Sequence, residues 1–184
     1  MSEERQALEE KLLSEAEGRA PVEPPRLEPF GLVLHHDGRW SHEGQPILNR
    51  KLREKFDRSV VYLPQEAKYV VQVGHFRGEI EIEEAGFFVR SVDLDGGAIV
   101  LSDGSQEPLR VETLRLSSLD GALLSQVKLE VVQGGLSARF TPASHAELLG
   151  AVDVDPDTDS YSLMLSGRLV RLPGALVDRP ADHD

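Results

Sequence analysis

A glycine-punctuated segment around the only tryptophan constrains the fold of this 184-residue chain most strongly. Asp37-Gly38 separates the apolar run at residues 32–34 from Arg39 and Trp40. This dipeptide is typical of a tight hairpin turn, because glycine adopts positive φ without steric cost and aspartate bonds its own backbone. The segment therefore predicts two antiparallel strands joined at Gly38.

The residues after this hairpin predict a helix. Gly44 and Pro46 are expected to end the second strand and to open a helix over residues 47–58. Leu48, Leu52 and Phe56 follow helical spacing and are expected to point inward, which leaves the basic residues of the segment in solvent.

The same order of elements returns later in the chain. We expect a strand at residues 128–132, a turn at Gly134-Gly135, a strand at 136–140 and a helix from Pro142, with Thr141 as its N-cap. Gly38 and Pro46 have the same spacing as Gly134 and Pro142, and this alignment pairs Trp40 with Leu136. The pattern indicates a degenerate duplication of a unit of two strands, one helix and two or more strands.

Alternating or short apolar runs predict further strands. They lie at residues 60–63, 69–73, 79–83, 87–94, 98–101, 109–116, 161–165 and 168–172. The expected class is α+β, mostly β with few helices, and each repeat holds antiparallel strands and one short helix.

The predicted organisation has four parts. An amphipathic helix and a proline-rich linker take residues 1–28, and the first repeat with a β extension takes 29–125. The second repeat is expected over 126–173, and residues 174–184 are expected to be a disordered tail.

Charge and composition narrow the function classes. The net charge is −12 and the sequence pI is about 4.9, so the average surface repels nucleic acid and anionic lipid. The chain has no cysteine, its start lacks the features of a secretory signal, and no apolar run approaches membrane-spanning length. We expect a cytoplasmic protein that binds neither nucleic acid nor membrane.

Motifs that would carry catalysis or cofactor binding are missing. There is no Gly-x-Ser-x-Gly elbow and no glycine-rich phosphate loop. The acidic run 153–160 begins like a calcium loop, but neither possible register supplies the required glycine and glutamate. His35 and His36 should face opposite sides of a strand, so at most one of them joins His42 in a metal cluster. We predict no cofactor, no metal site and no catalytic residues.

Four residues are the candidate ligand-facing positions: Trp40, His42, Tyr69 and His75. Trp40 has a second interpretation as a core anchor, since a lone tryptophan on a short strand beside a helix usually fills a core. The remaining motif residues, Asp37, Gly38, Gly44 and Pro46, are best explained by backbone geometry.

Three segments carry a resemblance to a known family, and they lie within residues 30–95: Asp37-Gly38-x-Trp40-x-x-x-Gly44-x-Pro46-Ile47, Tyr69-Val70-Val71, and residues 81–87. They resemble the bacterial family named domain of unknown function 1285. Residues 72–75 differ from the Thr-Pro-Val-Glu that is typical of that family. The resemblance implies an α+β fold with internal repeats and a role in signalling or ligand sensing, and it brings no catalytic residues.

Two functions follow as hypotheses. The first is a non-catalytic binding or regulatory module that binds a small ligand or a protein partner in a groove between the repeats. The alternative is an enzyme that uses carboxylates and a histidine, such as His42 or His75, in that groove. Dimerisation through a sheet edge is a third possibility, for which residues 79–83 are poorly suited because their charges protect an edge.

Overall fold

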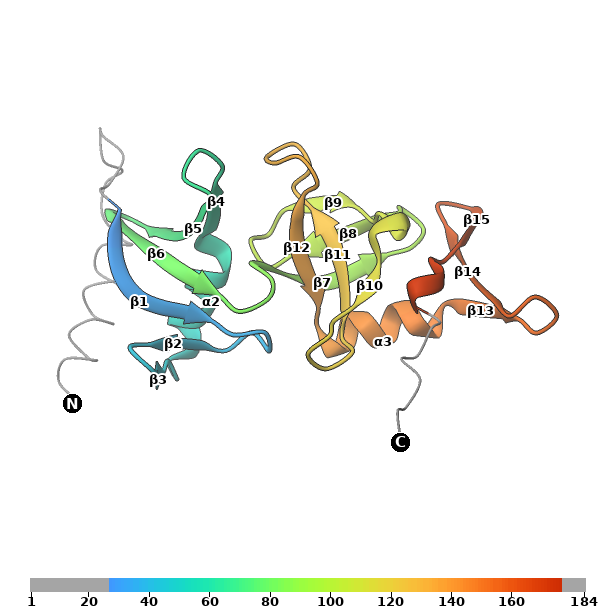
Figure 1. Cartoon of the computed structure of the whole chain (residues 1–184), viewed down its shortest axis with the longest axis horizontal. Helices are drawn as coiled ribbons and strands as arrows, with labels where there is room; N and C mark the ends of the chain where they lie inside the picture. The colour runs from blue at the N-terminus through green and yellow to red at the C-terminus, as the bar shows by residue number, and fades with distance from the viewer. Residues whose placement is uncertain (1–26, 177–184) are drawn as a thin grey trace. The chain divides into compact units, whose positions relative to one another are not determined.

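The computed structural model describes residues 27–176, which fall into two compact units divided between Gly86 and Phe87 (Figure 1). The predicted helix and linker of residues 1–28 lie almost wholly outside the described residues. The predicted tail 174–184 also lies outside them, except for residues 174–176, which form a 3-10 helix. Each unit contains a six-stranded sheet and one short α-helix, which confirms a mostly-β α+β fold with two degenerate repeats.

The first unit holds six strands and one helix. They are β1 (Glu28–Leu34), β2 (Trp40–His42), β3 (Gln45–Pro46), α2 (Arg50–Ser59), β4 (Val60–Leu63), β5 (Lys68–Val73) and β6 (Phe76–Ile82). The strand order is β3-β2-β1-β6-β5-β4. Neighbours are antiparallel except β1 and β6, which pair in parallel. The predicted strand at 79–83 is therefore central, between β1 and β5, and is not an edge.

The predicted hairpin at Gly38 is confirmed. Leu34 pairs with Trp40, and Gly38 has a φ of 82°. The Gly38 amide donates to the His35 carbonyl over 2.9 Å, and the Arg39 amide donates to Asp37 Oδ1 over 3.0 Å. Both properties expected of Asp-Gly, positive φ and a side chain bonded to its own backbone, are present.

The predicted start of the first helix was wrong by one turn. Pro46 lies in β3, and Glu43 and Gly44 form a positive-φ turn between β2 and β3. Helix α2 begins after Asn49, whose side chain accepts from the Leu52 amide over 3.1 Å. An asparagine cap therefore replaces the expected proline start.

The core of the first unit lies between its sheet and α2. Trp40 is 1% exposed and its ring lies 5.2 Å from that of Phe56. Its Nε1 donates to Asp57 Oδ1 over 2.8 Å, which satisfies the one polar atom of the indole. Leu52 is also buried, whereas Leu48 is 73% exposed and does not join the predicted inward face.

The second unit contains two sheets. Its elements are β7 (Phe87–Asp93), β8 (Ala98–Leu101), β9 (Gln106–Pro108), η1 (Val111–Thr113), β10 (Arg115–Leu116), β11 (Leu123–Val127), β12 (Leu136–Phe140), α3 (Pro142–Gly150), β13 (Val152–Asp155), β14 (Ser160–Leu165), β15 (Arg168–Arg171) and η2 (Gly174–Leu176). The six-stranded sheet has the order β10-β11-β12-β7-β8-β9, and β13-β14-β15 form a separate meander.

The two units repeat a hairpin, a helix and a three-stranded meander with different pairing. In the first unit the meander β4-β5-β6 joins the sheet, because β6 pairs in parallel with β1. In the second unit β7 pairs in parallel with β12, and the meander β13-β14-β15 forms its own sheet. Strands β7 to β9 thus occupy the sheet position that the first unit gives to its own meander.

Several predicted elements of the second unit differ from the structure. The partner of β12 is β11, not a strand at 128–132, because Lys128 has a φ of 54° and starts a turn. Residues 109–116 form a 3-10 helix and a two-residue strand instead of one strand. The division between the two units lies inside the segment 29–125 that was predicted as the first repeat plus a β extension.

The start of α3 agrees with the prediction. Thr141 is the N-cap, its hydroxyl accepts from the Ser144 amide over 3.3 Å, and Pro142 is the first helical residue. Ser144 is buried and its hydroxyl donates to the Val89 carbonyl over 2.7 Å, which ties α3 to β7. In residues 27–176 no helix is long and apolar enough to cross a membrane.

Replacing Trp40 with alanine is expected to destabilise the first unit by about 3–5 kcal/mol, because it leaves a cavity beside Phe56. Amide hydrogen exchange of β1 and α2 measures this loss of stability. It does not require tryptophan fluorescence, which the variant lacks. Leu48→Ala, at an exposed position, is the control and should change protection little. Unchanged protection in Trp40→Ala would contradict the core role.

Candidate functional site

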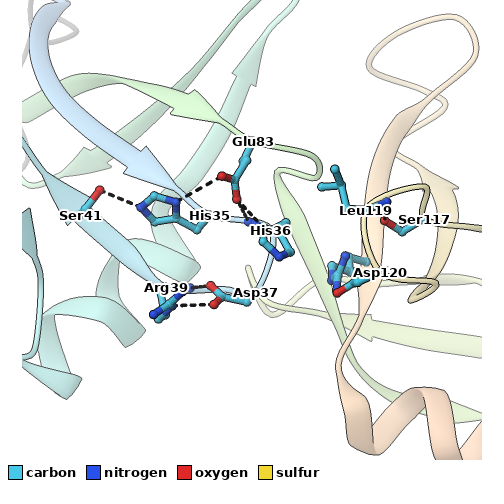
Figure 2. Close-up of polar contacts among 10 residues, drawn as sticks. His35, His36, Asp37, Arg39, Ser41, Glu83, Ser117, Leu119 and Asp120 are labelled. Atoms are coloured by element: carbon cyan, nitrogen blue, oxygen red, sulfur yellow. Dashed lines mark hydrogen bonds and ion pairs between the residues drawn. The ribbon is translucent and has the colours of Figure 1, made fainter. Parts of the chain in front are cut away.

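A polar cluster surrounds the β1–β2 turn of the first unit, and we call His35, His36, Ser41 and Glu83 the turn cluster (Figure 2). The histidines follow β1, Ser41 lies in β2, and Glu83 follows β6. The cluster joins the β1–β2 hairpin to the end of β6, and His36 and Glu83 are 47 residues apart in the sequence.

The parallel pairing of β1 and β6 places Glu83 in this cluster. Leu34 lies opposite Ile82, and the Glu83 amide donates to the Leu34 carbonyl over 3.1 Å. The next residue of β1 and the next residue of β6 therefore emerge side by side. Val33 pairs with Ser41, so the period-2 alternation places Ser41 and His35 on one face of the sheet.

Glu83 accepts hydrogen bonds from His36 and lies close to the ring of His35. The His36 amide donates to Glu83 Oε2 over 2.6 Å, and His36 Nδ1 lies 2.5 Å from the same oxygen. His35 Nδ1 lies 3.6 Å from Glu83 Oε1, and His35 Nε2 is hydrogen-bonded to Ser41 Oγ at 2.9 Å (Figure 2). The ring of His35 thus bridges a hydroxyl and a carboxylate.

These hydrogen bonds lower the pKa of Glu83. The amide of His36, then its side chain, hold the pKa of the Glu83 carboxyl at about 2. The side chain of Glu83 is 41% exposed, so water reaches the carboxylate as well. Glu83 is therefore a fixed anion at the surface of the turn.

An ion pair completes the turn. Arg39 Nε donates to Asp37 Oδ2 over 2.5 Å, and the arginine side chain is 73% exposed. Burial raises the pKa of Asp37. Hydrogen bonds from the amide and side chain of Arg39 lower this pKa, and together with nearby positive charge they outweigh burial, so the net shift is downward. The turn therefore presents charges of both signs beside the histidines.

His35 and His36 do not divide between two faces as predicted. Both approach Glu83, because the hairpin ladder still includes His35, whose amide donates to the Arg39 carbonyl, whereas the chain turns at His36 and strand alternation ends there. Neither contacts His42, whose ring lies 5.0 Å from that of Phe30. Within the described part of the chain, no group of three or more histidine and carboxylate side chains has an arrangement suited to a metal ion.

The four predicted ligand-facing residues take different environments. Trp40 lies in the core, and His42 is half-buried against Phe30. The Tyr69 ring packs on Tyr62, 4.9 Å away, and on Gly86, where a Cβ would lie 2.3 Å from the ring. Burial raises the pKa of the Tyr69 hydroxyl to about 12. His75 is exposed between β5 and β6.

These four residues are not brought together by the sheet. The register places His42, Leu32, Ile80 and Tyr69 in one row across β2, β1, β6 and β5. Three strand spacings of about 4.8 Å separate His42 from Tyr69, roughly 14 Å in all. The groove predicted between the repeats stays a prediction.

Sequence reasoning missed Ser41 and Glu83 as partners of the histidines. The Asp-Gly hairpin contains the signal for Ser41, since pairing Leu34 with Trp40 places Ser41 on the face of His35. Glu83 follows a strictly alternating run, but nothing local specifies that this run pairs with β1. The role of Glu83 in the cluster could therefore not be predicted from sequence patterns.

The acidic run 153–160 is part of the second unit's meander. It begins in β13, and residues 156–159 form the turn to β14. Asp155 accepts from the Asp157 amide over 3.0 Å and from the Thr158 hydroxyl over 2.7 Å. The Asp155 carboxylate is thus occupied by hydrogen bonds within the turn.

A second ion cluster lies in the second unit. Lys128 Nζ lies 2.9 Å from Asp103 and 3.1 Å from Glu107, with side chains only 14–16% exposed. The Lys128 amide also donates to Glu107 over 2.8 Å. These contacts fix the positive-φ turn after β11, which is a structural role.

Searches against protein-family models and against curated proteins give no match. The fold matches a crystal structure of a DUF1285 family protein from Silicibacter pomeroyi DSS-3, with a TM-score of 0.56 and 18% identity over 88% of this chain and 93% of the other. The chain has the fold of a DUF1285 family protein. A second DUF1285 structure, from Shewanella baltica OS155, has a TM-score of 0.44 and 12% identity over 66% of this chain and 91% of the other.

The shared fold supports the resemblance to DUF1285 seen at residues 30–95. At this level of identity the likeness concerns the fold alone.

The pH dependence of the turn cluster follows from Glu83. Its folded-state pKa is lowered from 4.5 to about 2, so the stabilisation is present above pH 4.5 and is lost as the pH falls towards 2. Carboxyl NMR should give a titration midpoint near 2 in the protein and a higher midpoint in His36→Ala.

Stability measurements check the same linkage. Glu83→Gln should be less stable than the unmodified chain at neutral pH, and the difference should vanish near pH 2. Glu81→Gln, at an exposed position of β6, is the matched control. A pH-independent deficit in Glu83→Gln would contradict the assignment.

Proposed function

We propose that this chain is a cytoplasmic, non-catalytic binding or regulatory module whose turn cluster contacts a small polar ligand or a protein partner. The observation that supports it most is the fixed position of a half-exposed carboxylate: Glu83 accepts two hydrogen bonds from His36, lies 3.6 Å from the His35 ring and remains open to solvent. Groups held in place before binding lose little side-chain entropy when a ligand arrives. The absence of cysteine fits a reducing compartment.

The charges of the turn favour a ligand with both donors and acceptors. Glu83 and Asp37 offer carboxylate oxygens, and Arg39 offers an exposed guanidinium on the same turn. His36 uses Nδ1 towards Glu83, so its ring orientation is set by the cluster. Nucleotides, amino acids and short polar peptide segments carry matching groups.

A thermal-shift screen of metabolites and nucleotide second messengers tests this function. A compound that binds the turn cluster at saturating concentration should raise the melting temperature by about 4 °C or more. The double variant His36→Ala/Glu83→Gln should lose that shift, because the two groups that fix the site are gone.

The matched control is His75→Ala, which removes an exposed histidine at another turn of the same unit. It should keep the full shift. A compound that stabilises all three proteins equally binds elsewhere and removes the turn cluster from the proposal.

One observation favours a second candidate function, an acyl-transfer enzyme. Ser41 Oγ, His35 and Glu83 are arranged in the order of nucleophile, base and orienting carboxylate, with His35 Nε2 at 2.9 Å and Nδ1 at 3.6 Å from its two partners. Ser41 is only 6% exposed, which restricts the approach of a substrate. We therefore place this function second.

A fluorophosphonate probe separates the two candidates. A binding module should leave Ser41 unlabelled, because its hydroxyl is buried and serves His35 as a hydrogen-bond partner. Intact-mass spectrometry of the full chain, with Ser41→Ala as control, measures the labelling. Stoichiometric labelling that Ser41→Ala abolishes would reverse the order of the candidates.

A further inference from the structure

The last strand of the second unit, β15, ends the three-stranded meander and pairs only with β14 among the described strands. A two-residue turn at Ser166 and Gly167, with φ values of 50° and 71°, joins the two strands. In such a hairpin the closing pair, Leu165 and Arg168, exchanges hydrogen bonds, and every second pair after it does the same. The bond from the Leu172 amide to the Tyr161 carbonyl, at 2.8 Å, fits this register.

The register decides which backbone groups face outward. Arg168 and Val170 direct their amides and carbonyls towards β14, so Leu169 and Arg171 direct theirs away from the sheet. These outward groups are the ones that a further strand would pair with. β15 therefore presents an open edge.

The side chains of this edge combine apolar and cationic groups. Leu169 is 67% exposed and lies opposite Met164, which is 49% exposed. Arg168 and Arg171 are both exposed at the two ends of the strand. An extended segment laid along β15 would meet apolar surface at its middle and a cation at each end.

A hollow of about 550 Å³ lies at the end of β15 and extends the edge. Arg171 lines it together with Ser160 and Tyr161, two residues that carry hydroxyl groups. Asp159 is the one acidic residue among the lining residues. The hollow therefore extends the end of β15 with polar residues of both charge signs.

Charge selects among the strands that could pair here. A second β15, antiparallel, would bring the arginines of the two copies close to one another, and like charges across strands destabilise pairing. The opposite edge of the meander, β13, carries Asp153 and Asp155 and repels acidic segments. Of the two edges of the meander, β15 is therefore the one that favours an acidic strand.

We propose that the β15 edge binds an extended acidic segment of a protein partner by strand addition, with partner carboxylates paired to Arg168 and Arg171. Backbone hydrogen bonds to Leu169 and Arg171 supply affinity, and the two arginines supply selection for acidic sequences. This site lies in the second unit and does not depend on the turn cluster.

Binding is tested with the full chain and a labelled peptide of about ten residues in which glutamates stand three positions apart among valines, because Arg168 and Arg171 lie on opposite faces of β15. Fluorescence anisotropy should show saturable binding, which a lysine–valine peptide of the same length does not reproduce. Arg168→Glu/Arg171→Glu should weaken binding by about tenfold or more, because attraction at both ends becomes repulsion. Lys51→Glu/Arg58→Glu, on α2, makes the same change in net charge and should bind as the unmodified chain does.

Two further measurements distinguish strand addition from charge attraction alone. A peptide methylated on alternate backbone nitrogens should lose binding, and the amides of Leu169 and Arg171 should gain protection from hydrogen exchange in the complex. Circular dichroism establishes that both double variants are folded.

Several results would overturn the proposal. They are the absence of saturable binding, equal binding by the methylated peptide, equal weakening in both double variants, or protection at β13 instead of β15. Concentration-dependent sedimentation that Leu169→Lys abolishes would assign the edge to a second copy of the chain and would also overturn it.

Discussion

The parallel pairing of β1 with β6 is the contact on which the first unit depends. It joins the N-terminal hairpin to the meander β4-β5-β6 and so closes one six-stranded sheet over α2. The same pairing places Glu83 at the end of β1. There the Glu83 amide donates to the Leu34 carbonyl, and the Glu83 carboxylate accepts from the His36 amide. Without it, the first unit would lack both its sheet and its turn cluster.

The second unit uses the same local elements with a different long-range pairing. Its hairpin β11-β12 is followed by α3 and a meander, but β12 pairs in parallel with β7, and Ser144 bonds the Val89 carbonyl of that strand. The meander is left as a separate sheet with open edges at β13 and β15. The same local sequence pattern thus occurs in two sheets with different strand partners, since strand pairing depends on contacts throughout each unit.

The two proposed sites follow from these pairings. The turn cluster arises where a parallel pair ends, because strand ends that run in one direction meet at one edge of a sheet. The β15 edge arises where a meander lacks the pairing that its counterpart in the first unit has. The turn cluster is fixed by hydrogen bonds to the Glu83 carboxylate, whose pKa is about 2. The β15 edge consists of backbone amides and carbonyls that face away from the sheet.

Local sequence patterns predicted the elements whose conformation depends on neighbouring residues. Asp37-Gly38 specified its hairpin, Thr141-Pro142 specified the start of α3, and the apolar alternation of residues 79–83 specified a strand. These patterns failed where tertiary contacts decide: Lys128 turns because its amide is held by Glu107, and His35 and His36 share Glu83 because β6 joins β1. Such contacts close long loops, and their free energy depends on packing between residues that no local pattern relates.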